Sequence, residues 1–244
     1  MSSQEGSSEG STAAAEGGRL RGSHPAEAIL YDRLIDAIID KHLRPGEHLN
    51  EVKLATAYDV PRSRVRRVLE RLRDESVVRF ELHRGAFVSR PTVAEARHVY
   101  EARREIEAVA VRLACAHATK SDIAALNAHL ADETEAFRTN HAVNRVAMQF
   151  HFLIARISAN PVLERILGTL IRRTVLIQSV YERKTGVLCL THEHVTIAGH
   201  IAAGRADAAA AEFVAHFDHV RQSLDLSEER WLEKDIYGGA DPLG

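Results

Sequence analysis

Apolar residues in the first third of the chain recur every three to four positions, as they do in helices that bury one face. The pattern begins at Pro25 and predicts a first helix, after which Pro45-Gly46 makes a turn. Beyond this turn the pattern predicts helices over about 51–57 and 62–75 and short strands over 77–81 and 86–88. The unit expected over residues 25–91 is therefore a helix-turn-helix followed by a hairpin.

Beyond the hairpin, the alternation typical of strands ends and the chain becomes a series of helices rich in Ala, Leu and Val. Asn160-Pro161 predicts a helix start with Asn as its N-cap, and Ser121 is expected to cap another helix. We count about six helices between 94 and 226 and expect an antiparallel bundle over 92–235. The predicted fold class is mainly α, with an all-α helical bundle behind the N-terminal helix-turn-helix domain.

Two polar segments flank these domains, over residues 1–24 and 236–244. The first is mostly Ser, Gly, Glu and Ala, so we predict a disordered tail that cannot bury enough apolar surface to order itself. It also lacks the basic start and apolar core of a secretory signal. No apolar run reaches the roughly 18 residues of a membrane span. Cys115 and Cys189 are expected to be buried free thiols, so we predict a cytoplasmic protein that meets no membrane.

Charge is distributed unevenly along the chain. The formal net charge of the 244 residues is −2 at pH 7, which argues against a uniformly basic surface. Between residues 61 and 90, however, nine arginines and four acids give a local charge of +5, so the rest of the chain carries −7. This asymmetry indicates that one part of the protein meets phosphate and another does not.

The helix predicted over 62–75 carries most of the positive charge, with six arginines within twelve residues. Such a density of guanidinium groups, directly after a helix and a turn, is typical of a helix that reads a DNA groove. In its first turn the backbone amides and the Ser63 hydroxyl can meet phosphate, while Arg62 and Arg66 can reach guanine edges. The hairpin turn with His83, Arg84 and Gly85 would lie over the neighbouring minor groove.

The alternative for these arginines is a solvated charged face, which is the usual role of a charge run on a helix. Two observations favour DNA binding instead. The arginines have few acids four residues further on to balance them, and the order of helix, turn, helix and hairpin is complete.

The stretch from Leu30 to Pro91 resembles the winged helix-turn-helix domain of GntR-family transcription regulators, in LRPGEHLNEVKLA, VPRSRVRRVLERL and RGAFV. The resemblance implies base and phosphate contacts for Arg62, Ser63 and Arg66. Together with the neighbouring charges, the candidate DNA-contacting set is Arg62, Ser63, Arg64, Arg66, Arg67, His83, Arg84 and Gly85.

Three residues of the recognition helix depart from the family pattern. Pro61 replaces the usual capping serine, Arg64 stands where proline is common, and Arg67 replaces a frequent glutamate. The added charge predicts tight, strongly salt-dependent DNA binding, to an operator sequence that cannot be copied from the family.

Three histidines of the helical domain, His151, His194 and His216, lie on apolar stripes that should face its core. The turn around Arg205 joins two helices expected to be antiparallel, and His194 and His216 each lie 11 residues from it. At about 1.5 Å per residue, both are about 16 Å from the turn and therefore level with each other. A single such histidine is more often a hydrogen-bonded core residue. Two level imidazoles and a third from another helix instead suit a divalent metal, zinc or similar.

Residues from about 92 to 226 resemble the FCD effector-binding domain of the FadR subfamily, in YEARREIEAVAVRLA, FHFLIARISANPVL and THEHVTIAGHIAAGRADAAAAEFVAHF. The resemblance implies a metal held by His151, His194 and His216. In many members an Asp is the fourth ligand, and here Ala147 occupies that position. A water or an effector carboxylate could fill the open position. Three neutral imidazoles would leave the charge of the metal uncompensated and would favour an anionic ligand.

Arg103 matches an arginine that often contacts the effector acid in related proteins. A buried guanidinium suits a carboxylate because it can donate two parallel hydrogen bonds. The alternative is a salt bridge to Glu107 or a surface charge.

The combined hypothesis is a ligand-responsive transcription regulator, not an enzyme, that binds a pseudo-palindromic operator as a homodimer. A small organic acid in the helical domain, seated on a histidine-bound metal, would change the spacing of the two DNA-binding domains.

Two alternatives remain open from the sequence. An open three-histidine site is compatible with a metal-dependent enzyme that carries a DNA-binding domain. Against this, Glu193, the acid beside His194, is expected to point about 100° away from it. Alternatively, the helical domain is only a dimerisation scaffold, and its histidines are ordinary core residues.

Overall fold

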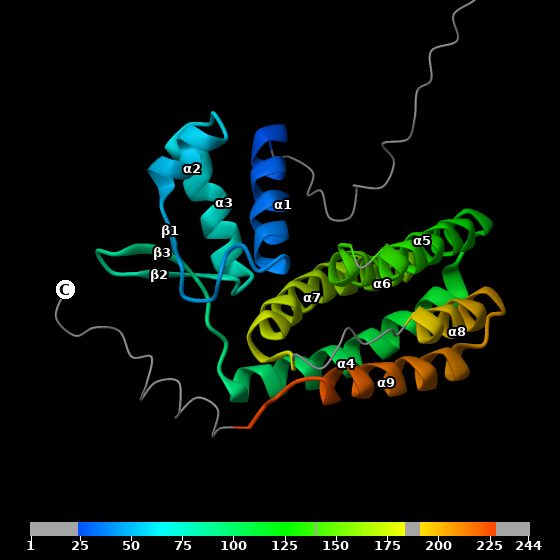
Figure 1. Cartoon of the computed structure of the whole chain (residues 1–244). Coiled ribbons are helices and arrows are strands. Elements are labelled where there is room, and N and C mark those ends of the chain that lie inside the picture. Colours follow the sequence, from blue (N-terminus) through cyan, green and yellow to red (C-terminus); the bar gives the residue numbers. More distant parts are fainter. Residues whose placement is uncertain (1–23, 140, 184–190, 228–244) are drawn as a thin grey trace, which may run out of the picture.

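The computed structural model describes residues 24–139, 141–183 and 191–227 of the chain. The elements in these ranges are α1 (Pro25–Ile39), β1 (His48–Leu49), α2 (Glu51–Ala57), α3 (Arg62–Asp74), β2 (Val78–Glu81), β3 (Gly85–Val88), α4 (Val93–His117), α5 (Lys120–Thr139), α6 (Val143–Ile157), α7 (Pro161–Tyr181), α8 (Thr191–Ala202) and α9 (Ala206–Gln222). Figure 1 shows a small head, made of α1 to α3 and the sheet, beside a larger bundle of α4 to α9. The mainly α fold class is thereby confirmed. The tails expected over 1–24 and 236–244 lie, except for His24, outside the described residues.

The sheet of the head contains a strand that the sequence pattern did not reveal. The strand order is β1-β3-β2, and both pairings are antiparallel. β1 pairs through His48↔Phe87 and Leu49↔Ala86. Because β1 is only two residues long, it cannot display the alternation of inward and outward side chains by which strands are recognised.

α3 is held in the head by its apolar side. Val65, Val68, Leu69 and Leu72 are at most 3% exposed and pack in one core with residues of α1, β2 and β3. Leu176 of α7 belongs to the same core, so the head and the bundle share apolar contacts. The recognition helix is therefore fixed both by its own domain and by a helix of the bundle.

α4 runs through the middle of the bundle and contacts α6, α7, α8 and α9, while α5 packs on α6 and α8. The core of the bundle is rich in fully buried rings, among them Tyr100, Phe150, Phe213 and Phe217. Cys115 is a free, partly buried thiol, and Cys189 lies outside the described residues. Among the described helices, none has the length and apolar character of a membrane span.

The predicted cap of α7 is confirmed, and that of α5 is corrected. The Asn160 side chain accepts hydrogen bonds from the amides of Val162 and Leu163. α5, however, begins at Lys120, two residues earlier than a Ser121 cap requires. Its start is held by Thr119, whose hydroxyl accepts from the Asp122 amide at 3.2 Å. Ser and Thr are both favoured N-cap residues, so the sequence alone could not choose between Thr119 and Ser121.

Asn160→Ala should lower the free energy of unfolding by about 1 kcal/mol, because two amides of the first turn of α7 lose their side-chain acceptor. Chemical denaturation followed by circular dichroism measures this change. Asn127→Ala, at an exposed position inside α5, is the matched control and should change stability little. Equal effects of the two substitutions would contradict a capping role for Asn160.

Candidate functional site

α3 carries most of the candidate DNA-contacting residues on the outside of the head. The exposed members are Arg62, Ser63, Arg66 and Arg67. Arg64 is half-buried. The N-cap residue, Pro61, makes no side-chain hydrogen bond to the first turn of the helix. A phosphate oxygen can therefore take the place that a capping side chain would occupy.

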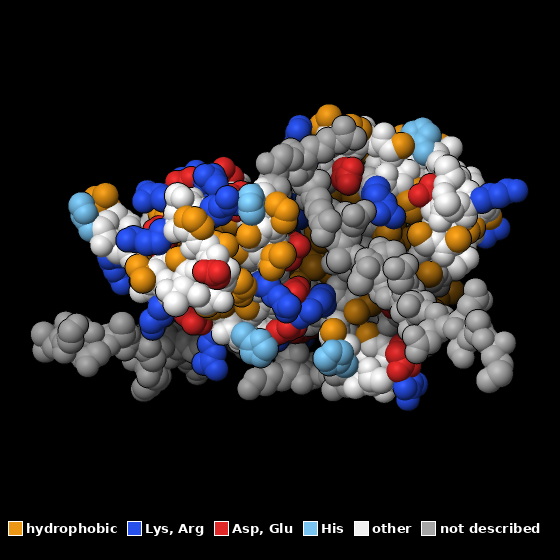
Figure 2. All heavy atoms as spheres, turned by 90° about the horizontal axis from the view of Figure 1, so that it is seen from above, with side chains coloured by type: hydrophobic (Ala, Val, Ile, Leu, Met, Phe, Trp, Pro, Cys, Tyr) orange, Lys and Arg blue, Asp and Glu red, His pale blue; other side chains and the backbone are white. Residues whose placement is uncertain are grey.

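Acids balance these arginines more closely than the sequence spacing predicted. Arg66 pairs with Glu70 at 3.3 Å, and Arg67 pairs with Glu27 of α1. In the view from above, basic and acidic side chains lie intermixed over the head (Figure 2). The spacing of acids along α3 could not reveal Glu27, because it is 40 residues away from Arg67 along the chain. Exposed pairs of this kind are weak in water, so DNA phosphates can displace the acids.

The hairpin between β2 and β3 presents its tip to solvent. His83 and Arg84 are exposed, and Arg84 pairs with Glu81. Gly85 has a φ of +88°, and a Cβ there would lie 3.2 Å from Nε2 of His48. The positive φ therefore favours glycine at this point, and a Cβ would also crowd the His48 ring.

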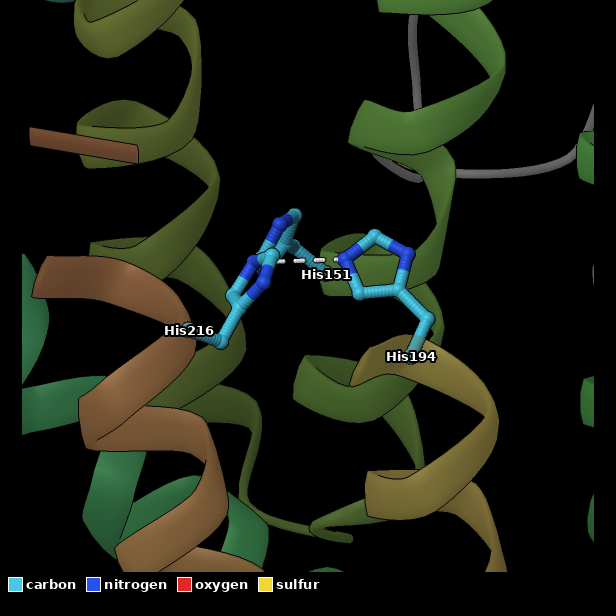
Figure 3. Close-up of side chains that lie close together, drawn as sticks. All are labelled: His151, His194 and His216. Carbon is cyan, nitrogen blue, oxygen red and sulfur yellow. Dashed lines mark hydrogen bonds between the residues drawn. The ribbon is translucent and has the colours of Figure 1, made fainter. Parts of the chain in front are cut away.

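The three predicted histidines meet inside the bundle. His151 of α6, His194 of α8 and His216 of α9 are buried, and one ligand atom from each lies within 4.8 Å of the others. Figure 3 shows the three rings converging, with Nε2 of His194 3.2 Å from Nε2 of His216. The level placement of His194 and His216, predicted from their equal distance to the turn, is confirmed. We call these three residues the histidine centre.

Each imidazole of the histidine centre has a carboxylate at its Nδ1 atom. Nδ1 of His151 lies 2.6 Å from Glu107, Nδ1 of His194 lies 2.7 Å from Glu133, and Nδ1 of His216 lies 2.8 Å from Glu193. A carboxylate in this place orients the ring through its Nδ1 atom. The Nε2 atoms therefore remain available at the shared centre.

Burial sets the protonation of these groups. It lowers the pKa of His194 to about 3 and holds the pKa of His151 well below its usual value, so both rings are neutral at pH 7. Burial also raises the pKa of Glu133 to about 7. Burial acts in the same direction on Glu193, but hydrogen bonds from His216 and His219 outweigh it and lower that pKa to about 2. Neutral imidazoles are the form that binds a divalent metal, and the Glu193 carboxylate stays ionised behind His216.

Glu193 corrects the sequence analysis. It was expected to point away from the site, yet it is buried and accepts from Nδ1 of His216 at 2.8 Å and from Nδ1 of His219 at 2.6 Å. Because α8 and α9 pack against each other, Glu193 lies on the side of α8 that faces α9 and contacts α9 directly. The Glu193 carboxylate would also compensate part of the positive charge of a metal ion at the centre.

Arg103 lies beside the histidine centre. Its Nε donates to Glu107 at 2.8 Å and its Nη1 donates to Thr174 at 2.6 Å. The alternative salt bridge to Glu107 thus exists. The third nitrogen, Nη2, is buried and has no hydrogen-bond partner among the described residues. A buried donor without a partner costs free energy, which a ligand oxygen would recover.

A cavity opens over this group of residues. About 90 Å³ of it is open to the centres of water molecules, and its wall includes Arg103, Thr174 and all three histidines. Ala147, the position of the missing Asp, also lines it. The remaining wall combines polar side chains with apolar ones: Asn144, Gln178, Glu182, Phe137, Met148 and Val175.

The carboxylates that orient the imidazoles were not predicted from the sequence. Glu133 lies in an acid-rich stretch and resembles a surface residue. Its spacing from Leu126, Leu130 and Phe137, however, places it on the apolar stripe of α5. A lone acid on an apolar stripe was the signal that could have revealed it.

Comparisons with known proteins identify both parts of the chain. Residues 27–88 match the family model "Bacterial regulatory proteins, gntR family", and residues 98–219 match the FCD domain. The Nta operon transcriptional regulator of Aminobacter aminovorans is 30% identical over 191 residues, which cover 77% of this chain and 90% of that protein. The HTH-type transcriptional regulator LutR of Bacillus subtilis is 25% identical over 206 residues, 75% of this chain and 93% of that protein.

Solved structures show the same fold. E. coli McbR/YncC superposes with a TM-score of 0.73 at 18% identity, over 82% of this chain and 97% of that one. A putative GntR regulator from Rhodococcus sp. RHA1 gives a TM-score of 0.66 at 26% identity, over 89% and 100% of the two chains. The chain therefore belongs to the GntR family of bacterial regulatory proteins and carries an FCD domain, which makes it a ligand-responsive, DNA-binding transcription regulator.

Proposed function

We propose that a small organic acid, bound in the FCD domain at a divalent metal held by His151, His194 and His216, controls operator binding by this regulator. The observation that carries the proposal is the convergence of the three imidazoles, each with a carboxylate at Nδ1. The Nε2 atoms of His194 and His216 are 3.2 Å apart and joined by a hydrogen bond, so one of them carries a proton. A cation between them would displace this proton and take both nitrogens as ligands.

The residues present fit a divalent metal such as zinc. Neutral imidazoles are good zinc ligands, and hydrogen-bonded carboxylates behind them raise their basicity. When bound, the ion supplies a positive charge that attracts an anionic ligand. Arg103 supports the same ligand class, because its buried Nη2 atom has an unused proton beside the centre.

The DNA-binding part of the proposal rests on the exposed side of α3 and on the hairpin tip. We propose Arg62, Ser63, Arg64, Arg66, Arg67, His83, Arg84 and Gly85 as the contacting set. A homodimer would place two heads on the two halves of a pseudo-palindromic operator. Gel-shift assays with genomic fragments test sequence-specific binding, and analytical ultracentrifugation tests the dimer.

Elemental analysis of the purified protein, followed by melting with zinc chloride and a panel of carboxylic acids, tests the ligand site. We expect bound metal and a rise in melting temperature with zinc, and a further rise with the acid that fits. An absence of metal and of any stabilisation would instead support a bundle that serves only as a dimerisation scaffold.

Ala147→Asp should tighten zinc binding by about tenfold or more, because it adds a carboxylate one helical turn before His151 at the wall of the cavity. The added charge should also weaken stabilisation by carboxylic acids, since it occupies the position that they would take. Isothermal titration calorimetry measures both effects. Gln149→Asp is the matched control, with the same charge change on the same helix outside the cavity wall. Equal zinc affinities of the two variants would show that position 147 does not face the ion.

A further inference from the structure

A mostly buried ion pair joins the recognition helix to the bundle. Glu75 is the C-cap of α3, and its carboxylate accepts two hydrogen bonds from Arg172 of α7, from Nε at 2.7 Å and from Nη2 at 3.2 Å. The Tyr31 hydroxyl of α1 donates to the same carboxylate, and Nε of Arg71 lies 3.4 Å from it. One carboxylate therefore connects the end of α3 with α1 and with α7.

The geometry of this contact is fixed on several sides. The two hydrogen bonds of Arg172 are parallel, so they define its orientation as well as its distance from Glu75. The guanidinium of Arg71 lies 3.7 Å from the centre of the Tyr31 ring. Two residues beyond Thr174 on α7, Leu176 is buried in the core of the head. A movement of α7 would thus be transmitted to α3 rather than absorbed by a loose surface.

The helices that hold this ion pair also line the cavity. On α7, Arg172 reaches Glu75, while Thr174, two residues later, accepts from Arg103 and lines the cavity. On α6, His151 belongs to the histidine centre, while the ring of Phe152, the next residue, lies 5.6 Å from the Arg172 guanidinium. On each of these helices, therefore, one residue faces the cavity and another, one or two positions away, lies at the ion pair.

We propose that Arg172 is the positioning residue through which the occupancy of the cavity reaches the recognition helix. An ion at the histidine centre acts on Arg172 through His151 and the neighbouring Phe152 of α6. A ligand on the free Nη2 of Arg103 acts on it through Thr174 of α7. In both cases Arg172 carries the change to Glu75 at the end of α3. The inference rests on the proposed ligand site. It adds the route by which that site acts on DNA binding.

Other ion pairs between head and bundle fit this role less well. Arg145 of α6 pairs with Asp36 and Asp40, and Lys41 pairs with Glu182. These pairs are more exposed than Arg172 and Glu75, and they end on α1 and on the residues that follow it rather than on α3. Exposed pairs contribute little rigidity because water competes for both partners.

The test compares DNA affinity with and without zinc, in the full-length protein. The probe is a duplex selected by the native protein from a random-sequence pool, and its Kd is measured in EDTA and in zinc chloride. For the native protein we expect the two Kd values to differ by about 5- to 150-fold, the usual range of coupling between sites. In Arg172→Gln and Glu75→Gln we expect this ratio to fall to within about twofold of one, while zinc affinity without DNA stays within about threefold of native.

Three further variants keep the result interpretable. Arg173→Gln is the matched control, because Arg173 is the next residue on α7 and pairs at 3.7 Å with Glu95 of the bundle. It should retain the native ratio. Arg172→Lys should restore part of it, since lysine keeps the charge without the paired donors. The double variant Glu75→Gln/Arg172→Gln removes both charges, so neither is left without its partner. If this variant melts cooperatively and its two Kd values are equal, misfolding does not explain the loss of coupling.

The proposal is overturned if Arg172→Gln keeps the native ratio, or if native protein with bound zinc has a ratio of one. Failure of the ligand site looks different: the native protein then binds no zinc in the absence of DNA. In that case both proposals are wrong. If Arg172→Gln instead shows the same ratio of Kd values as the native protein, only the proposed role of Arg172 is wrong.

Discussion

Arg66→Ala should weaken binding of a selected operator duplex by about 5- to 150-fold, the cost of one lost guanidinium contact to a base pair. Arg66 is exposed on the outer side of α3, and its partner Glu70 is also partly exposed, so the side chain is free to exchange that acid for DNA. Fluorescence anisotropy at fixed salt concentration measures the change. Arg62→Ala should have an effect of similar size, because Arg62 is exposed and its nearest acid, Glu51, is 3.6 Å away.

Arg138→Ala is the matched control for this measurement. Arg138 is likewise exposed and pairs with a glutamate of its own helix, Glu135, but it lies on α5 in the bundle. Its removal should leave DNA affinity within about twofold of native. If Arg66→Ala and Arg138→Ala bind equally well, Arg66 does not contact the operator.

His194→Ala should weaken zinc binding by on the order of 100-fold or more. Removing a residue that only orients a ligand already lowers metal affinity by about 10- to 100-fold, and removing the ligand itself should cost more. His194 stands at the centre of the site, with Nε2 towards His216 and Nδ1 on Glu133. A competition titration with a chromogenic chelator measures the affinity. The rise in melting temperature on adding zinc should disappear in parallel.

His192→Ala provides the comparison, since His192 lies two residues earlier on α8 with its side chain 76% exposed. It should keep native zinc affinity. Equal zinc content in native protein, His192→Ala and His194→Ala would assign any bound metal to another place and return the three histidines to an ordinary role in the core.

Periodicity and chain connectivity were enough to predict the histidine centre. The prediction requires only that two regular helices run antiparallel on either side of a turn. α8 and α9, which carry His194 and His216, meet this requirement. The orienting carboxylates could not be predicted in the same way. Glu107 and Glu133 reach the centre from α4 and α5, and their roles depend on how those helices are rotated against their neighbours.

The head shows the same limit. The exposed side of α3 and its apolar stripe follow from local spacing, and Val65, Leu69 and Leu72 on that stripe are buried. The pairing of Arg67 with Glu27 does not follow from spacing, because α1 and α3 meet only in the folded domain. The ion pair between Glu75 and Arg172 is a still longer connection, across 97 residues. Contacts of this kind belong to tertiary packing and leave no periodic trace in the sequence.

The histidine centre and its carboxylates draw on α4, α5, α6, α8 and α9, and α7 joins them through Thr174 and Arg103. An ion at that point would tie every described helix of the bundle to one spot. Local openings of single helices would then become rare, and the bundle would exchange its amide hydrogens mainly through global unfolding. Because proteases act on opened chains, the supply of metal would set the lifetime of the regulator in the cell as well as its response to a ligand.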